Sequence, residues 1–121
     1  MRLFQVDTSH SDKGGTTFVL SGELDLSTID HLQSAVDAGV NGSAQLVVMD
    51  LRGLTFLDST GLRLILRLHE RLRGQRGRLV LVQGPRRVHR VFELTLATEE
   101  LEIVADPADV GAPADASEGR G

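Results

Sequence analysis

The stretch LVVMDLRGLTFLDSTGLRLIL, residues 46–66, changes its hydrophobic pattern halfway and thereby indicates an α/β fold. Its first part, LVVMDL, is apolar on both alternating faces, which is typical of a strand that is covered on two sides. After Asp58 the apolar residues recur at helical spacing instead. A covered strand followed by a helix is the building unit of a parallel sheet with crossover helices.

The segments on either side of this stretch predict the remaining elements. A helix is expected over residues 27–42, with Ser27 as its N-cap and Gly39 or Gly42 as its stop. The other expected elements are two strands joined by a glycine hairpin turn (3–8 and 16–22), a covered strand (79–82), a helix with Pro85 at its first position (84–95) and a last strand (101–104). The order predicts a mostly parallel five-stranded sheet with an N-terminal hairpin and helices packed against it.

Length and composition limit the class of protein. The 121 residues leave room for one domain, expected over residues 1–104, and residues 105–121 form an acidic tail rich in Ala, Gly, Pro and Asp that we expect to be disordered. No apolar stretch reaches the roughly 20 residues of a membrane-spanning helix, and the first ten residues lack the apolar core of a secretory signal. We therefore expect a cytoplasmic protein without membrane attachment. The absence of Cys excludes disulfides and cysteine nucleophiles.

The helical projection after Asp58 places one hydroxyl away from the core. At 100° per residue, Ser59 falls on the same side as Arg63 and Arg67, so its hydroxyl should be accessible to solvent. It also lies at a helix start, where unpaired N–H groups and the dipole favour negative charge. The alternative is that Asp58 or Ser59 only caps the helix. The apolar residues expected to face the sheet are Leu62, Leu64, Ile65, Leu66, Leu68 and Leu72.

Catalytic and metal-binding motifs fit this chain poorly. A nucleophile elbow requires Gly two residues before the serine, where the chain has Leu57, and an aspartic-protease motif has one hydroxyl residue between Asp and Gly where DSTG has two. A helical zinc motif fails because HERLR, residues 69–73, has a single His. Asp50 follows a covered strand like the phosphate-accepting Asp of receiver domains, but the only Lys, Lys13, lies in the hairpin loop. Asp50 is expected to end its strand and to bond to the following turn; we expect no enzyme, metal or cofactor.

Three segments together resemble the STAS domain of bacterial anti-sigma factor antagonists, namely GELD at 22–25, LVVMDLRGLTFLDSTGL at 46–62 and GPRRVHRVFELTLA at 84–97. The resemblance covers residues 3–104, and FLDSTGL after DLRGLT is its specific part. It implies that the serine after the Asp, here Ser59, is phosphorylated by the anti-sigma factor, which is itself a serine kinase. It also implies that only the unphosphorylated antagonist binds this kinase productively and so frees a sigma factor.

The resemblance implies further partners and site residues. A serine phosphatase would reset Ser59, and we expect the antagonist itself to be a monomer. Asp25, Asp58, Thr60 and Gly61 are carried over as positions that flank the phosphosite or face the partner. A phosphoserine adds about −1.5 to −2 charges, so its desolvation at an interface would weaken binding without any change of fold.

Arg63 departs from the family pattern, which often has a second Gly at this position. It follows Ser59 by one turn, so it is expected either to pair with a phosphate there, to narrow the choice of partner by its bulk, or to be one more solvated helix residue. Two other functions stay open. One is a STAS scaffold or transporter-associated module without a switch. The other is nucleic-acid binding through residues 63–90, which hold nine Arg and one acid, although this segment has no aromatic residue.

Overall fold

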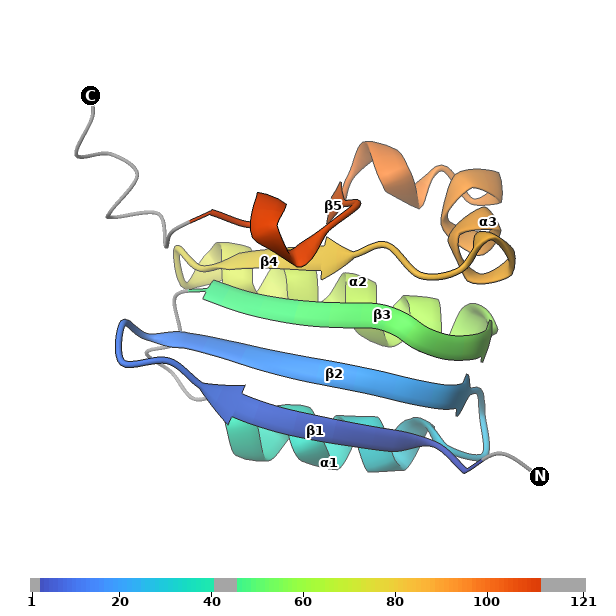
Figure 1. Cartoon of the computed structure of the whole chain (residues 1–121), viewed down its shortest axis with the longest axis horizontal. Helices are drawn as coiled ribbons and strands as arrows, with labels where there is room; N and C mark the ends of the chain where they lie inside the picture. Colours follow the sequence, from blue (N-terminus) through green and yellow to red (C-terminus); the bar gives the residue numbers. More distant parts are fainter. Residues whose placement is uncertain (1–2, 41–45, 112–121) are drawn as a thin grey trace.

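The computed structural model describes residues 3–40 and 46–111, and within them it contains a five-stranded sheet and three α-helices (Figure 1). The strands lie in the order β1-β2-β3-β4-β5, with β1 antiparallel to β2 and all other neighbours parallel. The elements are β1 (Gln5–His10), β2 (Gly15–Leu24), α1 (Ile29–Gly39), β3 (Leu46–Leu57), α2 (Ser59–Gly74), β4 (Arg78–Val82), α3 (Arg86–Leu94), the 3₁₀ turn η1 (Ala97–Glu99), β5 (Glu102–Val104) and the 3₁₀ turn η2 (Pro107–Asp109). The predicted α/β class, element order and N-terminal hairpin are confirmed.

The main core lies between the sheet and helices α1 and α2, which cover the same face of the sheet (Figure 1). Strand β2 shows the period of two that this arrangement requires, because Phe18, Leu20 and Leu24 are fully buried while Val19 between them is 42% exposed. On α2, five of the six apolar residues expected to face the sheet are buried, and Leu66 is half-buried. The projection of the helix from its sequence is therefore confirmed.

Strand β3 is longer than the sequence pattern predicted. The pattern ended it at Asp50 or Leu51, but the strand continues to Leu57. The register of β3 against β2 shifts between Asp50 and Gly53, which is a local bulge that interrupts the apolar alternation. Asp50 therefore lies inside the strand, and its carboxylate binds the backbone N–H and the guanidinium of Arg52 at 2.9–3.0 Å. The expectation that Asp50 ends its strand is wrong.

Two helix starts differ from the predicted ones by a few residues. Helix α1 begins at Ile29 with Thr28 as its N-cap, whereas Ser27 was expected there. The Ser27 hydroxyl instead donates to the carboxylate of Asp25 at 2.7 Å. Pro85 is the N-cap of α3, one position before the expected one. No helix in the described ranges is both long and apolar enough to cross a membrane.

The segment after β5 packs on the sheet, which moves the expected start of the tail. Residues 105–111 contain η2, whose first turn is capped by Asp106, and Val110 is only 8% exposed. Val110 packs with Leu46, Val80 and Val82, which point away from the main core. The expected tail at 105–121 is therefore wrong for its first seven residues, because one valine can bury its side chain there. Its remainder, like the alternative helix stop Gly42, lies outside the described residues.

Candidate functional site

The candidate site is built where β2 and β3 end side by side. Leu24 and Leu57, the last residues of the two strands, are direct partners in the parallel ladder. One residue later the backbone N–H of Asp58 donates to the carbonyl of Leu24 at 3.3 Å. The chain segments that follow the two strands, beginning with Asp25 and Asp58, are thus held together at one edge of the sheet. The sequence motifs GELD and FLDSTGL meet at this edge.

Asp58 fixes the first turn of α2. It has an extended backbone (φ −111°, ψ −174°), and its Oδ1 accepts hydrogen bonds from the backbone N–H groups of Thr60 at 2.9 Å and Gly61 at 3.2 Å. Its own carbonyl accepts the first helical bond, from Leu62 at 3.1 Å. The sequence allowed either Asp58 or Ser59 as the N-cap, and in the structure the N-cap is Asp58. The cap role therefore falls to the acid, and the serine beside it is left without that role.

Gly61 allows the helix start to approach both strand ends closely. A Cβ at this position would lie 2.6 Å from Cδ1 of Leu57 and 2.9 Å from Cδ2 of Leu24. Real Cβ atoms do not make such contacts, so a larger residue would force the buried side chains of Leu24 and Leu57, or α2 itself, to shift. Gly61 is buried and thus sets the position of the turn, while it offers no side chain to a partner.

Ser59 is the exposed residue of this turn. It is the first residue of α2 and is accessible to solvent, whereas Asp58 and Thr60 are half-buried. Arg63 is also exposed and follows Ser59 by one helical turn. Arg63 makes no hydrogen bond or ion pair with the part of the chain that the structure describes. The structure therefore brings Asp58, Ser59, Thr60 and Gly61 into one turn and leaves Arg63 on the next.

Asp25 organises the neighbouring loop. Its Oδ1 accepts hydrogen bonds from the hydroxyl of Ser27 at 2.7 Å and from the backbone N–H of Ser27 at 3.0 Å. The Thr28 hydroxyl closes the same turn, because it donates to the carbonyl of Glu23 at 2.8 Å and accepts from the Asp25 N–H at 3.0 Å. The hydrogen bonds that Ser27 and Thr28 donate to the Asp25 carboxylate, first of all that of the Ser27 hydroxyl, hold the pKa of Asp25 below its usual range despite partial desolvation. Asp25 thus shapes the loop beside Ser59.

Two exposed apolar side chains at this edge were not found from the sequence. Leu26, directly after Asp25, is 75% exposed, and Phe56, two residues before the N-cap of α2, is 42% exposed. Large exposed apolar residues close to one another are typical of surfaces that bind proteins. The signal for Leu26 was an apolar residue inside a turn rich in Asp, Ser and Thr. Phe56 was hidden because its strand was expected to end earlier.

A groove next to this edge carries positive charge. It has a volume of about 660 Å³ and lies between the end of β3 and the start of α3. Its lining includes Leu54, Pro85 and three exposed arginines, Arg86, Arg87 and Arg90. Other arginines of the basic segment already have partners, since Arg71, Arg73 and Arg78 bind Val40, Glu70 and Glu102. The nine arginines on which the alternative of nucleic-acid binding depends are thus split over several places.

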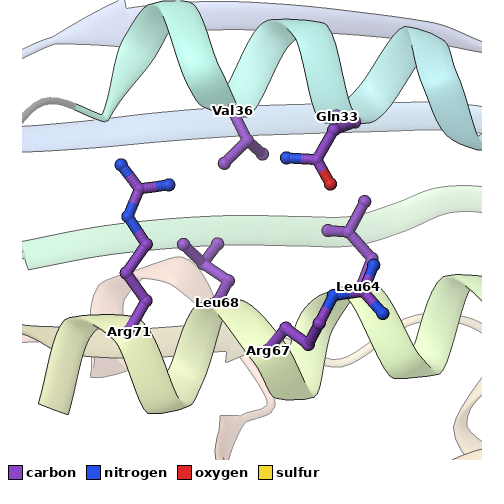
Figure 2. A pocket seen from close by; sticks show the side chains of 6 residues that line it. All are labelled: Gln33, Val36, Leu64, Arg67, Leu68 and Arg71. Carbon is purple, nitrogen blue, oxygen red and sulfur yellow. The ribbon is translucent and has the colours of Figure 1, made fainter. Parts of the chain in front are cut away.

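A second, smaller cleft lies between α1 and α2, away from the predicted site residues. Its volume is about 170 Å³. Figure 2 shows Arg71 reaching from α2 toward α1 and Arg67 running along α2 beside Leu64, while Gln33 and Val36 point toward α2 from α1. Arg71 donates to the carbonyl of Val40 just after α1 at 3.0 Å. None of the residues carried over from the family motifs lines this cleft. It is a junction between two helices.

Comparison with known proteins gives consistent matches. The family model described as STAS domain matches residues 5–110. The anti-sigma F factor antagonist of Lysinibacillus sphaericus is 29% identical over 77 residues, which cover 63% of this chain and 66% of that protein, slightly under two thirds. The anti-sigma-B factor antagonist of Listeria monocytogenes is 29% identical over 97 residues, which cover 80% of this chain and 81% of that protein. The crystal structure of an anti-sigma factor antagonist from Mycobacterium paratuberculosis has a TM-score of 0.80 at 26% identity and covers 88% of this chain and 90% of that one.

Proposed function

Because the chain belongs to the STAS-domain family, we propose that it is an anti-sigma factor antagonist whose binding is switched by phosphorylation of Ser59. In the unphosphorylated form it holds an anti-sigma factor and so frees a sigma factor in the cytoplasm. The anti-sigma factor is a serine kinase that transfers the γ-phosphoryl group of ATP to the Ser59 oxygen and releases ADP and the hydroxyl proton. A serine phosphatase reverses the step. The antagonist itself catalyses nothing and supplies only the acceptor.

The observation that carries this proposal is the exposure of Ser59 on a turn that is otherwise occupied. Asp58 is the N-cap and Gly61 packs against the ends of β2 and β3, while the Ser59 side chain is exposed to solvent. A kinase must bring its ATP within bonding distance of the acceptor oxygen, so an acceptor has to be accessible. A serine that served as N-cap would instead turn its oxygen toward the helix.

The local charges support a switch that works by repulsion and desolvation. The N–H groups of Thr60 and Gly61, which could otherwise bind an anion at the helix start, already donate to Asp58. A phosphate on Ser59 therefore gains little from them and adds about −1.5 to −2 charges beside the existing carboxylate. Burying this charge against a partner without a matching cation is costly. The fold needs no rearrangement for such a switch.

The surroundings of Ser59 suit a protein partner. Leu26 and Phe56, which lie next to the ends of β2 and β3, supply exposed apolar surface, and Asp25 shapes the loop that carries Leu26. We infer that Asp25, Asp58, Thr60 and Gly61 position this surface, and that Ser59, Leu26 and Phe56 contact the anti-sigma factor. Interfaces of proteins combine such apolar centres with a polar rim.

The experiment uses the full chain, a purified cognate anti-sigma factor and labelled ATP, followed by mapping of the modified residue. We expect one phosphate per chain on Ser59, none on the Ser59→Ala variant, and normal phosphorylation of Ser34→Ala, because Ser34 is an exposed serine on α1 and serves as the matched control. A Thr60→Val variant removes the neighbouring hydroxyl, which is the other possible phosphate acceptor in this turn, and should be phosphorylated like the wild type. Phosphate on Thr60 or Ser34 in place of Ser59 contradicts the assignment. Binding without any phosphorylation would instead favour a scaffold.

A further inference from the structure

Three possible metal ligands from distant parts of the chain meet beside the second half of α2. His69 and Glu70 lie on α2, and Glu100 lies just after η1, thirty residues further along the chain. One ligand atom of each residue lies within 4.8 Å of the other two. Two atoms bound to the same Zn²⁺ at about 2.1 Å can be at most about 4.2 Å apart. Small rotations of the side chains would therefore bring all three ligand atoms within bonding distance of one ion. Glu70 and Glu100 are exposed and can make them.

One ring nitrogen of His69, Nδ1, is buried without a hydrogen-bond partner among residues 3–40 and 46–111. Buried polar atoms are almost always satisfied in folded proteins, and an unsatisfied one indicates a missing partner or a functional role. A neutral imidazole nitrogen is also the commonest metal ligand in proteins. An unpaired imidazole nitrogen on the residue that meets two carboxylates therefore suits a metal ligand.

The neighbouring charges leave these carboxylates available. A cavity of about 330 Å³ is lined by His69, Glu100 and Glu102 together with Arg73 and Arg78. Glu102 is held by the guanidinium of Arg78 in two short hydrogen bonds of 2.7 and 2.9 Å. Glu100 makes no hydrogen bond or ion pair through its side chain with the described part of the chain. The cavity gives room for an ion and for the water that completes its coordination.

Of the two arginines that line this cavity, Arg78 pairs with Glu102, and Arg73 is the one that opposes a cation bound by Glu70. It pairs with Oε2 of Glu70 at 3.4 Å, with both side chains largely exposed. Such exposed pairs are worth little, and a carboxylate has a second oxygen that can bind the ion at the same time. Arg73 therefore lowers the affinity without blocking the site.

The geometry points to a Zn²⁺ site formed by His69, Glu70 and Glu100, which ties α2 to the segment between η1 and β5. One imidazole nitrogen and two carboxylate oxygens match the ligands that Zn²⁺ takes with a water in the fourth position. Mg²⁺ and Ca²⁺ prefer oxygen ligands alone and should not compete. The site lies about 15 Å along α2 from Ser59. It is independent of the phosphorylation proposed above.

The test is calorimetric titration of the full chain, freed of metal, with ZnCl₂. We expect one Zn²⁺ per chain. Loss of a group that only orients a metal ligand already costs about 10- to 100-fold in affinity, so His69→Ala and Glu100→Gln should each weaken binding by about tenfold or more. Arg73→Gln should tighten it. The matched control is His89→Ala, because His89 also lies on a helix beside a glutamate, Glu93 at 3.7 Å, but has no third possible ligand next to it among residues 3–40 and 46–111.

A second measurement keeps the proposal testable if His69→Ala folds poorly. Zn²⁺ should raise the melting temperature of the wild type and of His89→Ala, but not that of Glu100→Gln, whose substitution is on the surface. A tenfold excess of Mg²⁺ should change neither result. Equal Zn²⁺ affinity of the wild type and Glu100→Gln, or an equal loss in His69→Ala and His89→Ala, would overturn the site. Neither outcome bears on phosphorylation of Ser59.

Discussion

Oδ1 of Asp58 lies 2.9 Å from the backbone nitrogen of Thr60, and this hydrogen bond fixes the start of the helix that carries Ser59. The same oxygen also accepts from Gly61 at 3.2 Å. One carboxylate satisfies two of the N–H groups that a helix start leaves unpaired, so this turn is held by groups of the chain itself. The neighbouring serine is thereby held in place without taking part in the cap.

We predict that Asp58→Ala lowers the free energy of unfolding by about 1 kcal/mol, the usual cost of losing an N-cap side chain. Asp58→Asn should retain most of the stability, since Asn is an equally good cap. Urea denaturation at neutral pH measures both. Ser59→Ala is the control and should be neutral. A loss in Ser59→Ala as large as that in Asp58→Ala would mean that the serine, and not the acid, caps the helix.

Gly61 should not tolerate a methyl group. In Gly61→Ala the new Cβ would lie 2.6 Å from Leu57 and 2.9 Å from Leu24, so we expect a loss of about 1–3 kcal/mol despite the better helix propensity of Ala. The matched control is Gly74→Ala at the other end of α2, where nothing lies within 4 Å of the new atom. That variant should keep or slightly increase stability. Thermal or urea unfolding of both variants separates the cost of the close contacts at Gly61 from the effect of Ala on helix propensity.

Much of the fold was predictable because the apolar periods are clear. Five of the six residues of α2 that were expected in the core are buried, because its apolar residues lie on one side of the helix and only that side can pack on the sheet. The length of β3 was missed because Arg52 and Gly53 interrupt its alternation, and the structure absorbs them in a bulge. Ser27 was a reasonable cap by type, but its hydroxyl binds Asp25. Competition between two local hydrogen bonds cannot be resolved from residue types alone.

The candidate site was only partly predictable. The exposure of Ser59 followed from the helical projection and is confirmed. The contact between the ends of β2 and β3, through the Asp58 N–H and the carbonyl of Leu24, depends on strand order and could not be found locally. The meeting of His69 with Glu100 has the same origin, because the two residues are far apart in sequence. The spacing of residues in the sequence indicates the structure of a single helix or strand, whereas these contacts join two different elements.

Substitution of Arg63 tests how fast the phosphate on Ser59 is removed. It is exposed one turn after Ser59, so we predict that it pairs with the phosphate and slows its removal. In Arg63→Gly the phosphatase should act several-fold faster, or the range of anti-sigma factors bound should widen. Arg67→Gly, two turns along the helix, is the control. Unchanged dephosphorylation and unchanged partner affinity would make Arg63 an ordinary solvated residue.

Acid should weaken the bulge of β3 through Asp50. Burial raises the pKa of Asp50, but the hydrogen bonds and charge of Arg52 outweigh this and leave the pKa below its ordinary value of 3.8. A lowered pKa contributes stability above pH 3.8, and this contribution is lost as the pH falls below it. The free energy of unfolding should therefore fall less steeply between about pH 4 and pH 2 in Asp50→Asn than in the wild type. Asp12→Asn, in the exposed hairpin loop, should retain the wild-type slope.

The most direct test of the central claim compares the affinity of the cognate anti-sigma factor for the chain before and after stoichiometric phosphorylation of Ser59. The account predicts that the phosphate weakens binding by a few hundredfold, equivalent to roughly 3–4 kcal/mol, with an unchanged circular dichroism spectrum. Ser59→Ala should bind like the unphosphorylated chain. Equal affinity of the phosphorylated and unphosphorylated chains for the anti-sigma factor would contradict the account.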